Sequence, residues 1–121
     1  MDTALIIDDN KETADSLKQM LSLLVIDAEV AYSSRAGISI LQERTPGVLL
    51  LDLNMPGVDG FEVMAYLQRD PRLENVPVII VTSDDQPETI QKAKDAGAKG
   101  MLIKPASMEA IEKALKGAGL L

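Results

Sequence analysis

Five short apolar runs, separated by stretches of helical period, constrain the fold of this chain more than any other feature. Four runs are nearly continuous, whereas the second, Asp27–Tyr32, mixes apolar and acidic residues. Continuous apolar runs are typical of parallel strands buried on both faces, and their alternation with helical stretches predicts successive βα units. The mixed run is expected at an edge of the sheet. The predicted strands are Ala4–Asp8, Asp27–Tyr32, Val48–Asp52, Val78–Thr82 and Gly100–Lys104.

Five amphipathic helices are predicted after the five strands, from apolar residues that recur at spacings of three and four. Ser33 or Ser34 can cap the second helix and Ser107 the fifth, while Pro87 suits the first position of the fourth. Gly97 is expected to end the fourth helix in a left-handed conformation. The buried stripes are expected to be Ala14, Leu17, Met20, Leu21 and Leu24; Ala36, Ile40 and Leu41; Phe61, Met64 and Leu67; Ile90, Ala93 and the Lys94 stem; and Met108, Ile111 and Leu115.

The composition excludes several classes of protein. A length of 121 residues fits one domain, 1–121. The formal net charge of −7 repels nucleic-acid backbones and anionic membrane surfaces, so neither is expected as a direct partner. The absence of cysteine excludes disulfides and cysteine-based zinc sites. No apolar run approaches the roughly 20 residues of a membrane span, so a cytoplasmic protein is expected.

Polar residues gather where the predicted strands end. The first strand ends in Asp8 and Asp9, the third in Asp52, the fourth in Thr82 and the fifth in Lys104. In open parallel sheets ligands bind beyond the carboxyl ends of the strands, and a strand order of 2-1-3-4-5 would bring the first and third together. Three carboxylates, a divalent cation and one lysine balance in charge, and hard oxygen ligands suit magnesium. The alternative is that Asp8 and Asp9 only end a strand and cap the next helix.

These strand-end residues form an ordered pattern. It consists of Asp8-Asp9 after the first run, Asp52 within LLLDLNMPGVDG, Thr82-Ser83 after the fourth run and Lys104-Pro105 after the fifth. Together they resemble the receiver domain of two-component response regulators, from Leu5 to about Leu115. The resemblance implies a flavodoxin-like, doubly wound (βα)5 sandwich of α/β class, with a parallel five-stranded sheet of order 2-1-3-4-5. It also implies a phosphoprotein of a phosphorelay or two-component signal transduction system.

The resemblance assigns roles at the acidic site. Asp52 would accept the phosphoryl group as a carboxylate nucleophile. Asp9 and Asp52 would bind Mg²⁺ directly, Asp8 would act through a metal-bound water, and Asn54 would contribute its backbone carbonyl. The glycines of MPGVDG would let this loop turn tightly past the metal.

The resemblance also assigns residues that respond to phosphorylation. Thr82 would turn its hydroxyl onto the phosphoryl group, Lys104 would pair with one of its oxygens, and Ser83 supplies the small side chain expected beside the pocket. The bond from Lys104 to Pro105 would be cis. Met101 departs from the family pattern, which usually has Tyr or Phe three residues before the lysine; a flexible methionine can fill the same gap.

The resemblance implies partners as well. A sensor histidine kinase or a histidine phosphotransfer protein would donate the phosphoryl group, because the chain has no histidine of its own. A downstream effector protein or domain would read the surface of the fourth helix and fifth strand. The chain would not be an enzyme beyond catalysing its own phosphorylation and slow autodephosphorylation. It is expected to be either a stand-alone regulator or a receiver excised from a longer protein.

Rival functions fit the sequence less well. A pseudo-receiver that acts as a constitutive interaction module stays open, although such proteins commonly lose the acidic pair or the acceptor. An Asp-nucleophile phosphatase of the haloacid dehalogenase type requires an acid two residues after the nucleophile, where this chain has Asn54. A flavin binder would need a Gly-, Ser- and Thr-rich phosphate loop after the first strand. A calcium loop starting at Asp52 fails because Pro56 and Val63 occupy ligand positions.

Overall fold

A parallel five-stranded sheet forms the centre of the computed structural model, which describes residues 3–121. The strand order is β2-β1-β3-β4-β5, as predicted. The register places Ile7 of β1 between Ala31 of β2 and Leu51 of β3, so these strands end level with one another. The strands are β1 Ala4–Ile7, β2 Ala28–Ala31, β3 Val48–Leu51, β4 Val78–Thr82 and β5 Gly100–Ile103.

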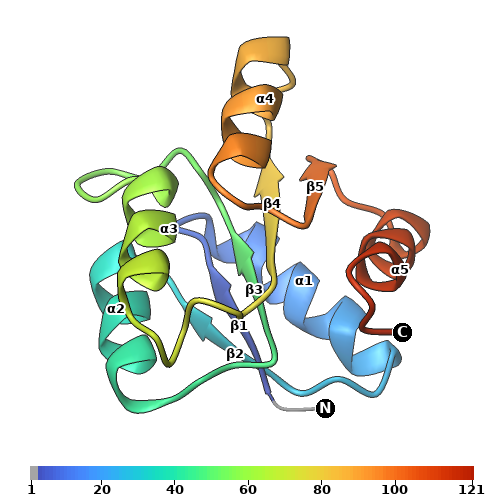
Figure 1. Cartoon of the computed structure of the whole chain (residues 1–121). Coiled ribbons are helices and arrows are strands. Elements are labelled where there is room, and N and C mark those ends of the chain that lie inside the picture. The colour runs from blue at the N-terminus through green and yellow to red at the C-terminus, as the bar shows by residue number, and fades with distance from the viewer. Residues whose placement is uncertain (1–2) are drawn as a thin grey trace.

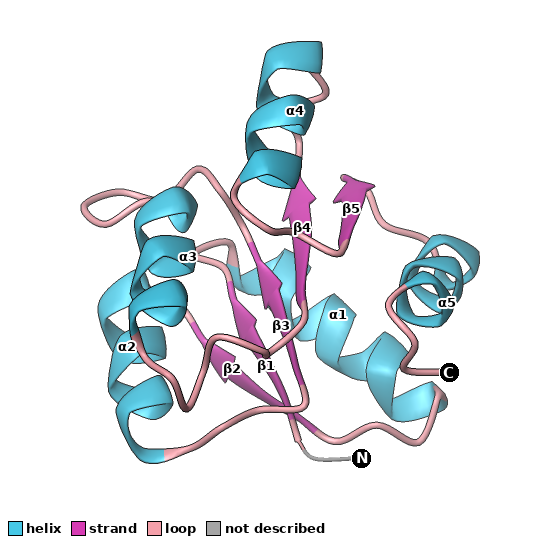
Figure 2. Cartoon of the chain, in the orientation of Figure 1, coloured by secondary structure: helices cyan, strands magenta, loops and turns pink. Residues whose placement is uncertain are grey.

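Five helices cover the two faces of the sheet (Figures 1 and 2). Three of them share a core cluster on one face, and the other two share a cluster on the opposite face. Alternate strand residues serve the two layers, since Leu5 and Ile7 belong to the first cluster while Ala4 and Ile6 belong to the second. The first face carries α2 Ser34–Glu43, α3 Gly60–Arg69 and α4 Pro87–Asp95, and the second carries α1 Lys11–Leu23 and α5 Met108–Gly117.

The helix ends follow the predicted local chemistry. Ser33 caps α2 by accepting a hydrogen bond from the amide of Ala36, and Ser107 caps α5 in the same way. Pro87 stands at the start of α4, and Gly97 follows that helix with φ 102°. Val25, after α1, has φ 61°, a left-handed conformation that β-branched residues rarely adopt. No helix among residues 3–121 is long and apolar enough to cross a membrane.

Two burial expectations are wrong. Ala36 is exposed, and α2 instead buries Ser34, Gly37 and Leu41. The reason is a close approach, because a Cβ on Gly37 would lie 2.3 Å from Ile7 Cδ1. The fifth strand is not buried throughout: it is the second edge of the sheet, and Ile103 is 40% exposed.

Candidate functional site

Asp8, Asp9 and Asp52 meet at the carboxyl ends of β1 and β3. Each offers one carboxylate oxygen, and the three oxygens lie within 4.8 Å of one another. The cause is the parallel register, which aligns Ile7 with Leu51 and so places the residues that follow side by side. Asp8 and Asp52 are buried, while Asp9 is exposed. The strand-end rule therefore located the acidic cluster correctly.

The two oxygens of Asp8 have different surroundings. Oδ1 accepts a hydrogen bond of 2.9 Å from the amide of Asn10. Oδ2 is buried, and within residues 3–121 no hydrogen-bond donor is directed at it, although Lys104 Nζ lies 3.0 Å away as an ion-pair partner. A buried carboxylate oxygen without a hydrogen bond, beside two further carboxylates, fits a hard divalent cation such as Mg²⁺.

Helix α1 is capped by Asn10 and not by the acidic pair. The side chain of Asn10 accepts a hydrogen bond of 3.0 Å from the amide of Thr13. The view that Asp8 and Asp9 serve as helix caps is therefore wrong, and Asp9 is left facing the cluster and solvent.

Lys104 supplies the positive charge of the site. It follows β5, and its backbone amide donates to the carbonyl of Thr82 at 2.8 Å. Its ammonium lies 3.0 Å from Asp8 Oδ2 and 3.6 Å from Asp52 Oδ2, so it contacts both buried carboxylates. The bond from Lys104 to Pro105 is cis, as predicted.

The electrostatics of Asp52 show that this compensation is incomplete. Burial raises the pKa of Asp52 above its ordinary value, and the neighbouring carboxylates of Asp8 and Asp9 raise it further. The ammonium of Lys104 and the amide of Asn54, which donates to Asp52 Oδ1 at 3.3 Å, oppose the increase. The raised pKa means that the folded protein disfavours the ionised form of Asp52, chiefly because the carboxylate is buried, and a bound cation would favour that form.

Thr82 and Asn54 form a polar contact that the sequence interpretation missed. Thr82 is fully buried at the end of β4, and its hydroxyl accepts hydrogen bonds from the amide of Asp84 at 3.2 Å and from Asn54 Nδ2 at 3.3 Å. The sequence pattern predicts a role only for the backbone carbonyl of Asn54, not for its side chain. Its proximity to Thr82 depends on the pairing of β3 with β4, which no local motif reports. Ser83 is exposed beside this contact.

The loop after Asp52 uses its glycines in two ways. Gly57 has φ 80° and turns the exposed part of the loop, as expected. Gly60 instead permits a close approach, because an added Cβ would lie 2.5 Å from the carbonyl oxygen of Asp52. The amide of Gly60 donates to the carbonyl of Leu53 at 3.0 Å, which closes the loop onto its own beginning.

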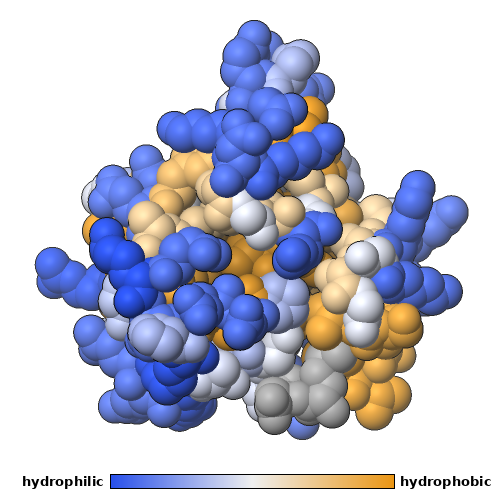
Figure 3. All heavy atoms as spheres, in the orientation of Figure 1, coloured by the Kyte–Doolittle hydropathy of each residue, from blue (hydrophilic) through white to orange (hydrophobic). Residues whose placement is uncertain are grey.

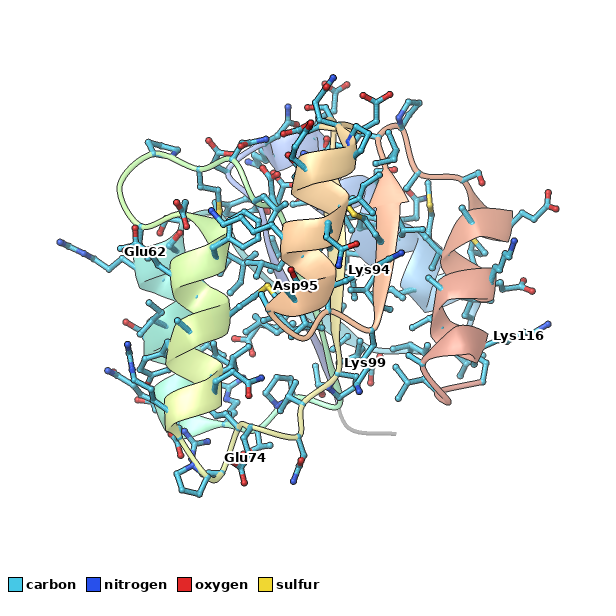
Figure 4. All side chains as sticks on the ribbon, turned by 45° about the horizontal axis from the view of Figure 1, so that its top comes forward. Glu62, Glu74, Lys94, Asp95, Lys99 and Lys116 are labelled. Atoms are coloured by element: carbon cyan, nitrogen blue, oxygen red, sulfur yellow. The ribbon has the colours of Figure 1, made fainter. Side chains whose placement is uncertain are left out.

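Met101 lies on β5 and is half-buried. It borders a cavity of about 110 Å³ between α4 and β5, whose other lining residues include Ala93 and Ile90. Lys94 of α4 and Lys99, just before β5, also line this cavity, and Figure 4 labels both side chains. Met101 therefore lies beside α4, the helix that together with β5 is expected to respond to the carboxylate site.

The likeness of this chain to known proteins extends over almost its whole length. The family model described as response regulator receiver domain matches residues 4–116. The chain is 32% identical over 111 residues to Protein PilH of Pseudomonas aeruginosa, covering 92% of each. It is 33% identical over 109 residues to the DNA-binding dual master transcriptional regulator RpaA of Synechocystis, covering 90% of this chain and 45% of that protein.

Solved structures show the same agreement. The chemotaxis response regulator CheY4 of Vibrio cholerae superimposes with a TM-score of 0.89 at 27% identity, covering 98% of both chains. A putative response regulator from Chloroflexus aurantiacus superimposes equally well at 23% identity, which supports the fold alone. Sequence and fold therefore indicate the same family.

Proposed function

Because the chain belongs to the response regulator receiver domain family, we propose that it is a phosphoacceptor whose Asp52 takes up one phosphoryl group with the help of Mg²⁺. The observation that carries this proposal is the convergence of three carboxylates within 4.8 Å beside the ammonium of Lys104. The donor would be the phosphohistidine of a sensor histidine kinase or a histidine phosphotransfer protein, since the chain contains no histidine.

The transfer is a substitution at phosphorus. A carboxylate oxygen of Asp52 attacks the phosphorus atom while the bond from phosphorus to the donor's imidazole nitrogen breaks, and that nitrogen keeps the electron pair. The product is an acyl phosphate on Asp52. Bound Mg²⁺ would supply positive charge for the carboxylates and the phosphoryl oxygens, held by Asp9, Asp52 and the Asn54 carbonyl, with Asp8 acting through a bound water.

Two other side chains serve the phosphorylated state. Lys104 already lies 3.6 Å from Asp52 Oδ2 and has only to move its ammonium from carboxylate to phosphoryl oxygen. The Thr82 hydroxyl accepts bonds from Asn54 and Asp84, so its proton is free to be donated to the phosphoryl group. In this proposal no external substrate is turned over, and hydrolysis of the acyl phosphate returns the chain to its starting state, so we class it as a signalling protein rather than an enzyme.

The proposed output is a change in the surface formed by α4 and β5. Thr82 ends β4, Lys104 follows β5, and the two are joined by a backbone hydrogen bond of 2.8 Å. Displacement of either side chain is therefore passed to the strand that carries Met101. Because Met101 has no ring to rotate, we expect a smaller and more graded change than an aromatic residue would produce, and an effector protein or domain would read it.

Phosphorylation itself is tested by intact-mass measurement after incubation with acetyl phosphate. We expect one added phosphoryl group with Mg²⁺, none with a chelator, and none on Asp52→Asn. Asp85→Asn is the matched control, since it removes an exposed carboxylate outside the cluster and should label as the wild type does. Labelling of Asp52→Asn at the wild-type rate would refute the assignment.

A further inference from the structure

Ser34 is a buried polar residue that the proposed phosphoryl transfer does not use. It is the first residue of α2 and is 3% exposed. The other buried polar or charged side chains of residues 3–121 are Asp8, Asp52 and Thr82, all of which belong to the carboxylate site. Burying a hydroxyl is costly unless it is hydrogen-bonded, so the partner of Ser34 indicates what its burial provides.

The hydroxyl of Ser34 is directed at the loop between β3 and α3. It donates to the carbonyl oxygen of Val58 and lies 3.7 Å from Met55 Sδ. A serine has one proton to donate, and a carbonyl oxygen is a much better acceptor than a thioether, so the bond to Val58 is the significant one. Ser33, the preceding residue, has a purely local role because its hydroxyl caps the same helix at Ala36.

This bond fixes the middle of a loop that begins at the phosphoacceptor. The loop lies at the upper left of Figure 1, near the starts of α2 and α3. Met55 is buried, Pro56 and Gly57 are exposed, and Gly60 closes the loop by bonding to Leu53. The Ser34 bond therefore holds the loop just after its exposed turn, while the Asn54 amide bonds to Asp52 near the start of the loop.

We propose that Ser34 is a positioning residue for the cation site. By holding the carbonyl of Val58 it keeps the loop from Leu53 to Asp59 in one conformation, and this loop orients the Asp52 carboxylate and the Asn54 backbone. Ser34 touches no reacting group and acts only through this loop. The inference rests on the proposed function, because the site that it positions is the one assigned there to Mg²⁺.

The test compares Ser34→Ala with Ser33→Ala. Both variants remove one serine hydroxyl from the start of α2, and both should lower the melting temperature. Only Ser34→Ala removes a bond to the loop, so calorimetric titration should show Mg²⁺ binding weakened roughly threefold to tenfold, the effect of one lost hydrogen bond. Ser33→Ala should bind Mg²⁺ as the wild type does. In metal-free protein, amide hydrogen exchange of residues 54–59 should accelerate in Ser34→Ala alone.

The outcomes separate this inference from the proposed function. Wild-type protein that binds no Mg²⁺ would overturn both. A wild type that binds Mg²⁺ and is phosphorylated, with Ser34→Ala binding within about twofold of it and unchanged loop exchange, would overturn the role of Ser34 alone. If Ser34→Ala does not fold, Ser34→Cys replaces it: the thiol is a weaker donor of similar shape, so Mg²⁺ affinity should fall below that of the wild type, whereas an unchanged affinity would overturn the proposal.

Discussion

At the carboxylate cluster, the charged side chains that suit cation binding also lower the stability of the metal-free fold. Burial and the Asp8 carboxylate raise the pKa of Asp52 and so disfavour its ionised form, and the ammonium of Lys104 is shared between the two carboxylates. An arrangement of this kind is costly in the metal-free protein, because like charges in a buried site disfavour each other's ionised forms. The negative charge that binds a cation is therefore expected to lower the free energy of unfolding when the cation is absent.

We predict that Asp52→Asn stabilises the metal-free protein at neutral pH by about 1 kcal/mol. The pKa of Asp52 is raised in the folded state, so the wild type gains stability from this group at low pH and loses it as the pH rises through that pKa. The advantage of the variant should accordingly shrink as the pH is lowered toward the ordinary value of 3.8. Urea unfolding of both proteins at pH 7 and near pH 3.8, with a chelator present, measures the difference in their free energies of unfolding. A variant less stable than the wild type at pH 7 would contradict the prediction.

The contact of Asn54 with Thr82 shows where sequence reasoning about residues stops. The convergence of Asp8, Asp52 and Lys104 could be predicted, because each follows a strand and parallel strands end at one edge of a sheet. The bond from the Asn54 amide to the Thr82 hydroxyl could not, because it depends on a rotamer and on a neighbouring strand's exact position. The bond from Ser34 to Val58 was missed for the same reason.

At the scale of elements, the residue Val25, which follows the C-terminus of α1, has a strained backbone. Val25 has φ 61° and is 93% exposed, so its side chain does little packing while its backbone adopts a conformation that suits glycine. We predict that Val25→Gly stabilises the protein by roughly 0.5 kcal/mol, since relief of a penalty of about 1–2 kcal/mol is partly offset by the greater freedom of glycine in the unfolded chain.

Leu23→Gly is the matched control for this prediction. Leu23 is also a large exposed apolar residue, 69% exposed, but it is the last residue of α1 and does not have a positive φ. Glycine there relieves no backbone strain and loses helix propensity, so it should destabilise the protein, though by less than the roughly 1 kcal/mol that glycine costs in a helix interior. Thermal unfolding of both variants checks the opposite signs, and a loss of stability in Val25→Gly would show that the backbone strain is not significant.

Elements differ in how far the sequence predicts them. Strand positions, the order of the sheet and the caps at Ser33 and Ser107 were confirmed, because they follow from periodicity and local chemistry. The buried face of α2 was predicted wrongly, because periodicity cannot show that Gly37 has to lie against Ile7. The left-handed Val25 was also not foreseen, since valine carries no signal for that conformation.

At the scale of the whole molecule, the site and the proposed output surface are joined through β5, which leads directly into Lys104. In the view of Figure 3 hydrophilic residues dominate the top and the left, whereas apolar residues gather at the centre and at the lower right, where Figure 1 shows the C-terminus and the end of α1. Leu23, Val25 and Leu121 are among the exposed large apolar residues. The apolar surface at the lower right lies away from the strand ends that carry the carboxylates.

We predict that phosphorylation of the site, or its mimic, changes the conformation of residues distant from Asp52. Beryllofluoride with Mg²⁺ should change amide chemical shifts at Asp52 and Thr82 and also along residues 86–101, because Thr82 and Lys104 are connected through paired strands β4 and β5. Met101→Tyr should enlarge the shifts in this stretch, since a ring has two discrete positions where methionine has many. Perturbations confined to the neighbourhood of Asp52 would mean that effectors read another face.

The sparse packing of α4 favours local opening of this helix. Ala93 is the one residue of α4 that is buried, and Lys92 adds a cation–π contact 4.2 Å from the centre of the Phe61 ring. Detaching this helix exposes little apolar surface, whereas detaching β1 or β3 requires unfolding of the whole core. We therefore expect a hierarchy of lifetimes, in which the central strands persist until global unfolding while α4 opens and recloses many times in between.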